Sequence, residues 1–281
     1  MPELPEVESI RLQLEKFLVG HVIEDVEVRN KKYGVWDKKN IIKGKISGVR
    51  RFGKVLVIDL SNDYSVVTHV KMTGQFIYQG PNLKTRVIYT KKVVGGVPGR
   101  HTHVIFTLDH GGILYFNDYR RFGWMELTQK SKVKNQNFIK KLGHEFLKDL
   151  TRNEFSEIVS KARKPIKVLL MDQTKMAGVG NIYANDALWL AKIYPQRKAN
   201  GLGKEEQQVL FDAIESVLKE GIKRGGASEQ AFVTPDGGEG RYQDFTLVYG
   251  REGEPCKTCK TPIKKIKLGG RGTYFCQECQ K

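Results

Sequence analysis

Hydrophobic residues recur at helical spacing near the amino terminus. Apolar residues from Val7 to Leu18 fall on one face of a helix that the sequence predicts from about Pro5 to Val19. Pro5 suits the first turn of a helix, and Gly20 is typical of a position that ends one. Such an apolar face needs a core to pack against, so we expect the amino end of the chain to be held firmly.

The pattern changes to short β-strands between His21 and Trp124. Stretches rich in β-branched and aromatic residues alternate with turns that contain Gly, Asn and Asp. This half is therefore predicted to form a β-sandwich or a flattened barrel. Residues Gly80 to Arg100, rich in Lys, Arg and Gly, predict a long loop or an added hairpin. The clearest strand-like stretches are 49–60, 65–70, 103–108 and 113–116.

A polar, lysine-containing stretch from Gln129 to Asn137 separates this half from a helical one. Thr151 and Glu154 have the spacing of a capping box, and residues 204–223 predict a long amphipathic helix. The predicted fold class is α+β and multidomain. We predict an N-terminal β-sandwich domain with a leading helix over residues 1–128, a linker over 129–137, a helical domain over 138–245 and a terminal module over 246–281.

The amino-acid composition predicts that the protein binds a polyanion. The 281 residues include 48 Lys and Arg against 31 Asp and Glu, which gives a formal net charge of +17. This excess is typical of nucleic-acid-binding proteins, although a basic proteome or a solubility effect would also produce it. No apolar run approaches the ~20 residues of a membrane span, and no secretion signal opens the chain. We therefore expect no membrane partner and a cytoplasmic location.

The terminal module carries two cysteine pairs, Cys256-x2-Cys259 and Cys276-x2-Cys279. This spacing predicts one zinc ion held by four thiolates. Because all four positions would be filled, the ion would have no open site for chemistry and would stabilise a short β-hairpin. A pair of disulfides is the competing interpretation, which a reducing compartment disfavours.

The first residues suggest covalent chemistry. If Met1 is removed, Pro2 becomes an N-terminal secondary amine, which can attack an electrophilic carbon and form an iminium. An α-amino group has a pKa of about 8, so a sizeable fraction is neutral near pH 7. Glu3 beside it could transfer protons. The simpler alternative is that Pro2 and Pro5 only start a helix.

Three further stretches of the β-rich half suggest chemistry or DNA contact. Lys54 opens an apolar strand and could reach a phosphate or a sugar, although most such lysines are simply solvated. Met72 lies in a Met-Thr-Gly turn, where a flexible apolar side chain at a loop tip competes with a core position. Arg120 and Arg121 next to Phe122 suit insertion into nucleic acid, against the alternative of a buried Phe with surface arginines.

A glycine-rich turn joins two predicted helices in the second half. Gly178 and Gly180 precede Asn181, which would begin a helix with free backbone N–H groups. Such a helix start is a potential phosphate site, and a glycine-rich turn alone is weak support for one.

Taken in order, these motifs resemble the bacterial formamidopyrimidine-DNA glycosylases along nearly the whole chain. The matching segments are the opening stretch, the Met-Thr-Gly turn, residues 118–123, residues 172–183 and the cysteine tail. The resemblance implies a β-sandwich, a helix–two-turn–helix domain and a β-hairpin zinc finger. It also implies a bifunctional enzyme of base excision repair that acts on double-stranded DNA. Such an enzyme excises oxidised purines, such as 8-oxoguanine and formamidopyrimidines, and cleaves abasic sites by β,δ-elimination.

The resemblance also implies roles for individual residues. Pro2 would attack the sugar C1′, Glu3 would transfer its protons, and Lys54 would serve the elimination step. Residues Gly225 to Tyr242 would form a loop that closes over the damaged base. Met72, Arg120 and Phe122 would fill the gap left by the everted nucleotide, and His101, Arg163, Lys167, Asn181 and Arg271 would contact DNA, with Arg271 assisting δ-elimination.

Some positions depart from the family pattern. Lys71 replaces the usual glycine, Tyr119 replaces the usual proline, and the segment from Gly80 to Arg100 is longer than usual. These departures bear on which lesions and opposite bases are preferred. Two alternatives stay open: an endonuclease VIII type that acts on oxidised pyrimidines, against which Leu4 speaks, and a zinc-containing DNA-binding protein without catalysis. We expect a monomer in each case.

Overall fold

The computed structural model describes residues 1–81, 83, 90–229 and 231–281, and these form two compact units. The first unit contains residues 1–140 together with 224–243, and the second contains 141–223 together with 244–281. Part of the predicted loop from Gly80 to Arg100 lies outside the described residues. The chain thus enters the second unit, returns to the first for a short segment, and ends in the second.

Helix α1 (Leu4–Leu18) confirms the predicted leading helix to within one residue at each end. Its apolar face is fully buried, as the helical spacing predicts. Pro5 lies in its first turn, where its missing N–H leaves no hydrogen bond unmade. Gly20 follows the helix with φ +98°, a conformation that glycine adopts without strain.

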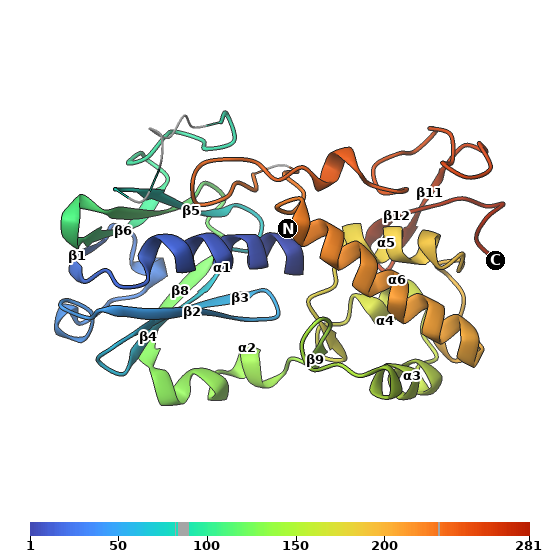
Figure 1. The fold of residues 1–281 in the computed structure, drawn as a ribbon, viewed down its shortest axis with the longest axis horizontal. Helices are drawn as coiled ribbons and strands as arrows, with labels where there is room; N and C mark the ends of the chain where they lie inside the picture. The colour runs from blue at the N-terminus through green and yellow to red at the C-terminus, as the bar shows by residue number, and fades with distance from the viewer. Residues whose placement is uncertain (82, 84–89, 230) are drawn as a thin grey trace. The chain divides into compact units, whose positions relative to one another are not determined.

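Two antiparallel four-stranded sheets form the rest of the first unit, which confirms the predicted sandwich. One sheet has the order β1 (Ile23–Val28), β6 (Thr102–Leu108), β7 (Ile113–Asp118) and β5 (Gly74–Gln79). The other has the order β2 (Ile46–Phe52), β3 (Val55–Leu60), β4 (Tyr64–His69) and β8 (Trp124–Gln129). Side chains of both sheets join the buried face of α1 in one core, and Figure 1 shows α1 running alongside both sheets.

Short helical turns complete the first unit. The polar stretch after β8 is a 3₁₀ helix, η4 (Lys130–Asn135), followed by α2 (Asn137–Lys140). Val133 and Ile139 of these turns pack with valines of β3 and β4 in a small core of their own. The structure therefore packs this stretch onto the outer face of a sheet, whereas its polar composition predicts an interdomain linker. The remaining turns are η1 (Lys31–Tyr33), η2 (Lys38–Asn40) and η3 (Asp109–Gly111).

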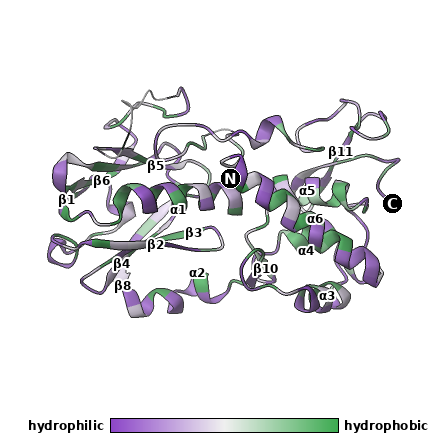
Figure 2. Ribbon diagram, in the orientation of Figure 1, coloured by the Kyte–Doolittle hydropathy of each residue, from purple (hydrophilic) through white to green (hydrophobic). Residues whose placement is uncertain are grey.

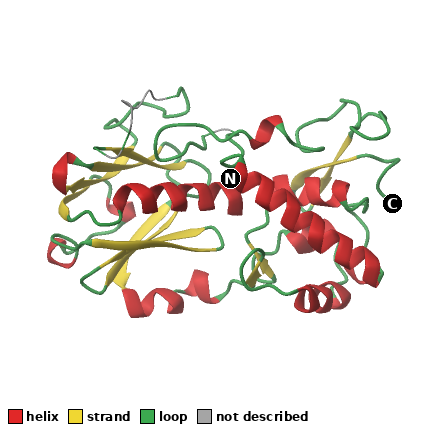
Figure 3. Ribbon diagram, in the orientation of Figure 1, coloured by secondary structure: helices red, strands yellow, loops and turns green. Residues whose placement is uncertain are grey.

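The second unit is mainly helical, as Figure 3 shows. The predicted capping box begins α3, where Thr151 and Glu154 exchange hydrogen bonds. Figure 2 shows hydrophobic and hydrophilic residues alternating along α6, the predicted amphipathic helix. Its Gly221 allows Tyr183 to approach, because a Cβ there would lie 2.5 Å from the tyrosine ring. The helices are α3 (Arg152–Lys161), α4 (Ile166–Leu170), α5 (Asn181–Leu190) and α6 (Lys204–Lys223), with η5 (Ala199–Gly201) before α6. The 3₁₀ helix η6 (Tyr242–Asp244) spans the point where the chain passes from the first unit back to the second.

Two small pairs of strands belong to the second unit. β9 (His144–Glu145) pairs in parallel with β10 (Met176–Ala177), and β11 (Lys264–Leu268) pairs with β12 (Arg271–Phe275) in an antiparallel hairpin. This hairpin lies between the two cysteine pairs, as predicted. None of the helices in the described part of the chain has both the length and the apolar composition needed to cross a membrane.

Candidate active site and metal centre

The amino terminus is fixed by a buried carboxylate. Pro2 and Glu3 are buried, whereas Met1 is 48% exposed. Glu6, only 1% exposed, accepts a hydrogen bond of 2.7 Å from the backbone N–H of Glu3 through Oε2. Its Oε1 accepts another, also 2.7 Å, from the backbone N–H of Ala227. One side chain therefore holds both the residue next to Pro2 and the segment that returns from the second unit.

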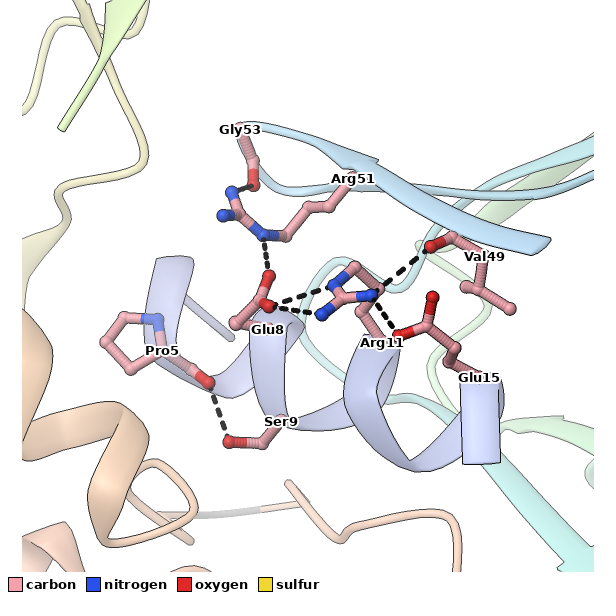
Figure 4. Close-up of polar contacts among 8 residues, drawn as sticks. All are labelled: Pro5, Glu8, Ser9, Arg11, Glu15, Val49, Arg51 and Gly53. Carbon is pink, nitrogen blue, oxygen red and sulfur yellow. Dashed lines mark hydrogen bonds and ion pairs between the residues drawn. The ribbon is translucent and has the colours of Figure 1, made fainter. Parts of the chain in front are cut away.

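A second network attaches the turn that carries Lys54 to helix α1. Arg51 Nε donates to Glu8 Oε2 at 2.7 Å, and Arg51 Nη1 donates to the Gly53 carbonyl at 2.8 Å (Figure 4). Arg11 Nε donates to the other oxygen of Glu8 at 2.8 Å. Burial alone would raise the pKa of Glu8, but these hydrogen bonds from Arg11 and Arg51 lower it. The turn before the buried Lys54 is thus tied to the helix that begins just after Pro2.

A buried aspartate, Asp118, organises two turns, one just before β5 and one just after β7. Asp118 accepts hydrogen bonds from the hydroxyls of Tyr33 (3.1 Å) and Thr73, and from the backbone N–H groups of Arg121 (3.0 Å) and Gly123 (2.6 Å). Because Thr73 belongs to the Met-Thr-Gly turn and the two N–H groups belong to residues 118–123, the carboxylate holds the two turns together.

The predicted trio meets at the tips of these turns. The guanidinium of Arg120 lies 3.7 Å from the sulfur of Met72 and stacks over the ring of Phe122 at 4.6 Å. Phe122 is 50% exposed, although a side chain of this size and polarity is more often buried. An exposed aromatic, a thioether and a guanidinium therefore form one projecting group.

Two histidines near these turns are held neutral. Burial, followed by the charges of Lys71 and Lys54, lowers the pKa of His69 to about 3. Burial and the neighbouring Arg100 also lower the pKa of His101. The ring of His101 contacts Tyr119 edge-on with ring centroids 6.3 Å apart.

In the second unit, the ammonium of Lys167 is enclosed by acceptors. Lys167 is 1% exposed and donates to Asn181 Oδ1 (2.7 Å), the Gly272 carbonyl (3.0 Å) and Thr273 Oγ1 (2.7 Å). Asn181 is the first residue of α5, and strand β12 begins at the exposed Arg271. Lys167 thus connects Asn181 to the strand of Arg271, while Arg163 lies exposed between α3 and α4.

The four predicted cysteines converge in the second unit. Their sulfur atoms all lie within 4.8 Å of one another, with Cys256 and Cys279 at 3.8 Å and Cys259 and Cys276 at 3.3 Å. Tetrahedral zinc with Zn–S bonds of about 2.3 Å brings sulfurs to about 3.8 Å from each other. A disulfide requires about 2.05 Å, and all four cysteines are free. The residues therefore fit one structural zinc ion and not the alternative pair of disulfides.

Three families match successive parts of the chain. The formamidopyrimidine-DNA glycosylase N-terminal domain matches residues 1–125, the formamidopyrimidine-DNA glycosylase H2TH domain matches 142–233, and the zinc finger found in FPG and IleRS matches 253–281. The chain belongs to the formamidopyrimidine-DNA glycosylase family. This agrees with the resemblance based on its motifs.

Full-length relatives agree with this membership. Formamidopyrimidine-DNA glycosylases of Listeria innocua and Rickettsia africae are each 40% identical to the chain and match all of it, over 100% and 99% of their own lengths. The Fpg of Lactococcus lactis, in a complex with DNA that contains an abasic site, has a TM-score of 0.86 and 34% identity, with complete coverage of both chains. The α+β fold with a terminal zinc finger is thus that of a formamidopyrimidine-DNA glycosylase.

Some residues of this glycosylase site were not found from the sequence alone. Glu6, Glu8 and Asp118 bind backbone or side-chain donors and hold the predicted residues in place. The spacing of Glu3 and Glu6 at a helix start was an available signal, because a glutamate three residues after the cap typically bonds back to it. Asp118 has local partners in Arg121 and Gly123, but its link to the other turn had no local signal, because Thr73 is 45 positions away.

Proposed function

We propose that this glycosylase of base excision repair excises oxidised purines, such as 8-oxoguanine and formamidopyrimidines, from double-stranded DNA and then cleaves the strand by β,δ-elimination. The observation that carries this proposal is the buried Pro2–Glu3 pair at the start of α1, held by Glu6. The Lactococcus lactis relatives were solved with DNA that contains Fapy-dG lesions or abasic sites.

The reaction uses Pro2 as a nucleophile once Met1 is removed. The nitrogen lone pair bonds to the sugar C1′, the C1′–base bond breaks, and the departing base takes its electron pair and a proton. Glu3 supplies and recovers protons during ring opening, which leaves an iminium between Pro2 and C1′. The iminium acidifies the neighbouring C2′–H and so promotes elimination of the 3′ phosphate. Lys54 contacts phosphate and assists this second stage.

Lesion access requires eversion of the nucleotide, because a stacked sugar cannot be reached. Unstacking costs a few kcal/mol. The projecting trio of Met72, Arg120 and Phe122 offsets this by occupying the vacated space, with Arg120 facing the orphaned base. The net charge of +17 supplies non-specific attraction to phosphate, so binding is expected to weaken steeply with salt.

The second unit grips DNA through Asn181, Arg163, Arg271 and Lys167. Because Lys167 is enclosed by three acceptors, we assign it mainly to the orientation of Asn181 and of the strand that begins at Arg271. The zinc ion, bound by the four thiolates, holds the hairpin that presents Arg271. The protein acts as a monomer on chromosomal DNA in the cytoplasm.

Borohydride trapping on abasic DNA tests the mechanism. We expect one covalent adduct, which peptide mapping places on Pro2 and which disappears in Pro2→Gly or when Met1 is retained. An adduct on an internal lysine would refute the role of Pro2, and the absence of any adduct would favour a non-catalytic zinc protein.

A second candidate substrate class has one specific observation in its favour. A Lactococcus lactis Fpg, 35% identical to this chain, was solved with DNA that contains an oxidised pyrimidine. Parallel excision assays on an 8-oxoguanine and an oxidised-pyrimidine duplex decide between the classes. Faster excision of the pyrimidine would replace our proposal with the endonuclease VIII type of activity.

A further inference from the structure

Two segments far apart in sequence cover the same face of a sheet. Along β5, Phe76 and Tyr78 point into the core between the sheets, so Ile77 points to the opposite, outer face. There, Val93 packs in a separate cluster with Val233. Val93 comes from the described part of the long loop, residues 90–100, and Val233 comes from the returning segment, residues 224–243. Figure 1 draws both segments on the β5 side of this sheet.

Lys92 connects the two segments by polar contacts. Its Nζ donates to the Ser228 carbonyl at 2.5 Å and to Glu239 Oε2 at 2.5 Å. Gln75 of β5 is 3% exposed and donates both to the Lys92 carbonyl at 2.9 Å and to the Ala231 carbonyl at 2.5 Å. The long loop therefore holds the returning segment at both its beginning and its end.

Other polar contacts hold the returning segment where it enters and leaves this face, and Phe232 and Val233 pack into apolar clusters between them. Glu6 binds the N–H of Ala227, and the N–H of Tyr78 donates to the Pro235 carbonyl at 2.7 Å. Asp236 N–H donates to Gln13 Oε1 at 3.0 Å. Between these anchors, Lys92 and Gln75 donate from outside the segment to the carbonyls of Ser228 and Ala231. Within the segment itself, Ser228 also bonds to Gln243 and Gly240.

We propose that Lys92 is a positioning residue for lesion recognition: it keeps the returning segment docked on the sandwich before DNA arrives. The inference rests on the proposed function, in which residues 225–242 close over the everted base. A segment that becomes ordered only on binding loses conformational freedom at that step, which weakens binding. A segment already docked avoids this loss. The contacts from residues 90–100 thus give this chain a device that favours the binding of damaged bases.

The test compares Lys92→Met with Lys91→Met, which removes the same charge from the exposed neighbouring position. Hydrogen exchange of the free protein reports docking directly. We expect faster exchange of backbone amides in the 224–243 segment, including those of Val233 and Gly237, in Lys92→Met and no change in Lys91→Met. Equal protection in both variants would overturn the inference.

Kinetics separate lesion recognition from general damage to the site. Abasic DNA offers no base for the segment to cover, so cleavage of abasic DNA should change less than twofold. For a duplex with 8-oxoguanine, kcat/KM should fall about tenfold, mainly through KM, because a charge-assisted hydrogen bond and an ion pair are lost. An equal loss on both substrates would show a merely structural effect and would overturn the proposal.

Further variants make the outcome decisive. Lys92→Arg keeps the charge and should restore most of the lesion activity. Glu239→Gln removes the negative charge of this ion pair and should have little additional effect when combined with Lys92→Met. If Lys92→Met does not fold, hydrogen exchange of the 224–243 segment in Lys92→Arg and Glu239→Gln still decides whether the Lys92 contact docks the segment: exchange should stay slow in Lys92→Arg and become faster in Glu239→Gln. If the wild-type protein cleaves neither substrate, the proposed function fails, while hydrogen exchange still decides whether Lys92 docks the segment.

Discussion

Replacement of Glu6 by glutamine is the sharpest test of how the amino terminus is held. The substitution keeps the shape of the side chain but turns one oxygen into an NH₂ group. Because Glu6 accepts two backbone N–H groups at 2.7 Å each, the amide can satisfy only one of them. The second backbone N–H then faces the NH₂ group of the glutamine, at a side chain that is only 1% exposed.

The magnitude follows from these two bonds. A hydrogen bond to a charged group contributes about 1.5–3 kcal/mol, and a buried donor left without an acceptor costs about 1–3 kcal/mol. The neutral amide is easier to bury than a carboxylate, which offsets part of the loss. We expect the first unit to lose about 2–3 kcal/mol of unfolding free energy. For a domain of this size class, that lowers Tm by roughly 4–12 °C.

Calorimetry, trapping and hydrogen exchange measure the effect. The matched control is Glu15→Gln, which makes the same chemical change at a side chain that is 48% exposed and paired with Arg11. Such a surface pair contributes at most about 1 kcal/mol. Glu6→Gln should also slow borohydride trapping by up to about 100-fold, because small displacements of reacting groups are that costly. The reasoning is refuted if the two variants melt within 1 °C of each other and protect the Ala227 amide equally.

Four other outcomes are expected. In NMR titrations, His69 should stay neutral until the pH approaches 3. Because the pKa of His69 in the unfolded chain is 6.5, the free energy of unfolding should fall as the pH decreases from about 6.5 towards 3. The assignment would be contradicted if His69→Gln lost stability over the same pH range. The pKa of Glu8 is lowered, so Glu8 stabilises the folded state above its ordinary pKa of 4.5 and loses this contribution as the pH falls through its folded pKa. Arg51→Met should therefore weaken the dependence of Tm on acid pH. An unchanged dependence would count against the network of Glu8, Arg11 and Arg51. Phe122→Ala should reduce kcat/KM for lesion DNA about tenfold without changing Tm by more than about 2 °C, because the side chain is half exposed, and full activity would exclude a wedge role. Chelation should remove one zinc per chain by elemental analysis and weaken DNA binding in fluorescence anisotropy, whereas undiminished binding by the metal-free protein would show that the hairpin does not need the ion.

The elements with strong local patterns could be predicted from the sequence. Helix α1 and several strands of the sandwich follow from the spacing of apolar residues, although the stretch 49–60 forms two strands and β5 and β8 lie outside the predicted stretches. The Thr151–Glu154 box marks the start of α3. The cysteine spacing was sufficient to predict the cluster of four thiols. In each case, the signal lies within a few residues of the structure that it specifies.

Features that depend on distant partners could not be predicted in the same way. The stretch after β8 looks like a linker because Val133 is the only large apolar residue in 129–137. Val133 nevertheless packs on the sheet, together with Phe138 and Ile139 of the following turn. The burial of Lys167 depends on Thr273, which is 106 positions away. The docking of residues 224–243 by Lys92 likewise joins segments that have no shared local pattern.

The contrast between an exposed Met1 and a buried Pro2 has a practical consequence for enzyme preparations. Under the proposed mechanism, the nitrogen of Pro2 stays an amide until an aminopeptidase removes Met1, so newly made chains would be latent enzymes. The specific activity of a sample would then be proportional to the fraction of chains that have lost Met1. Mass spectrometry of the intact chain would measure that fraction. Any affinity tag fused upstream of Pro2 would lock the preparation in the latent form.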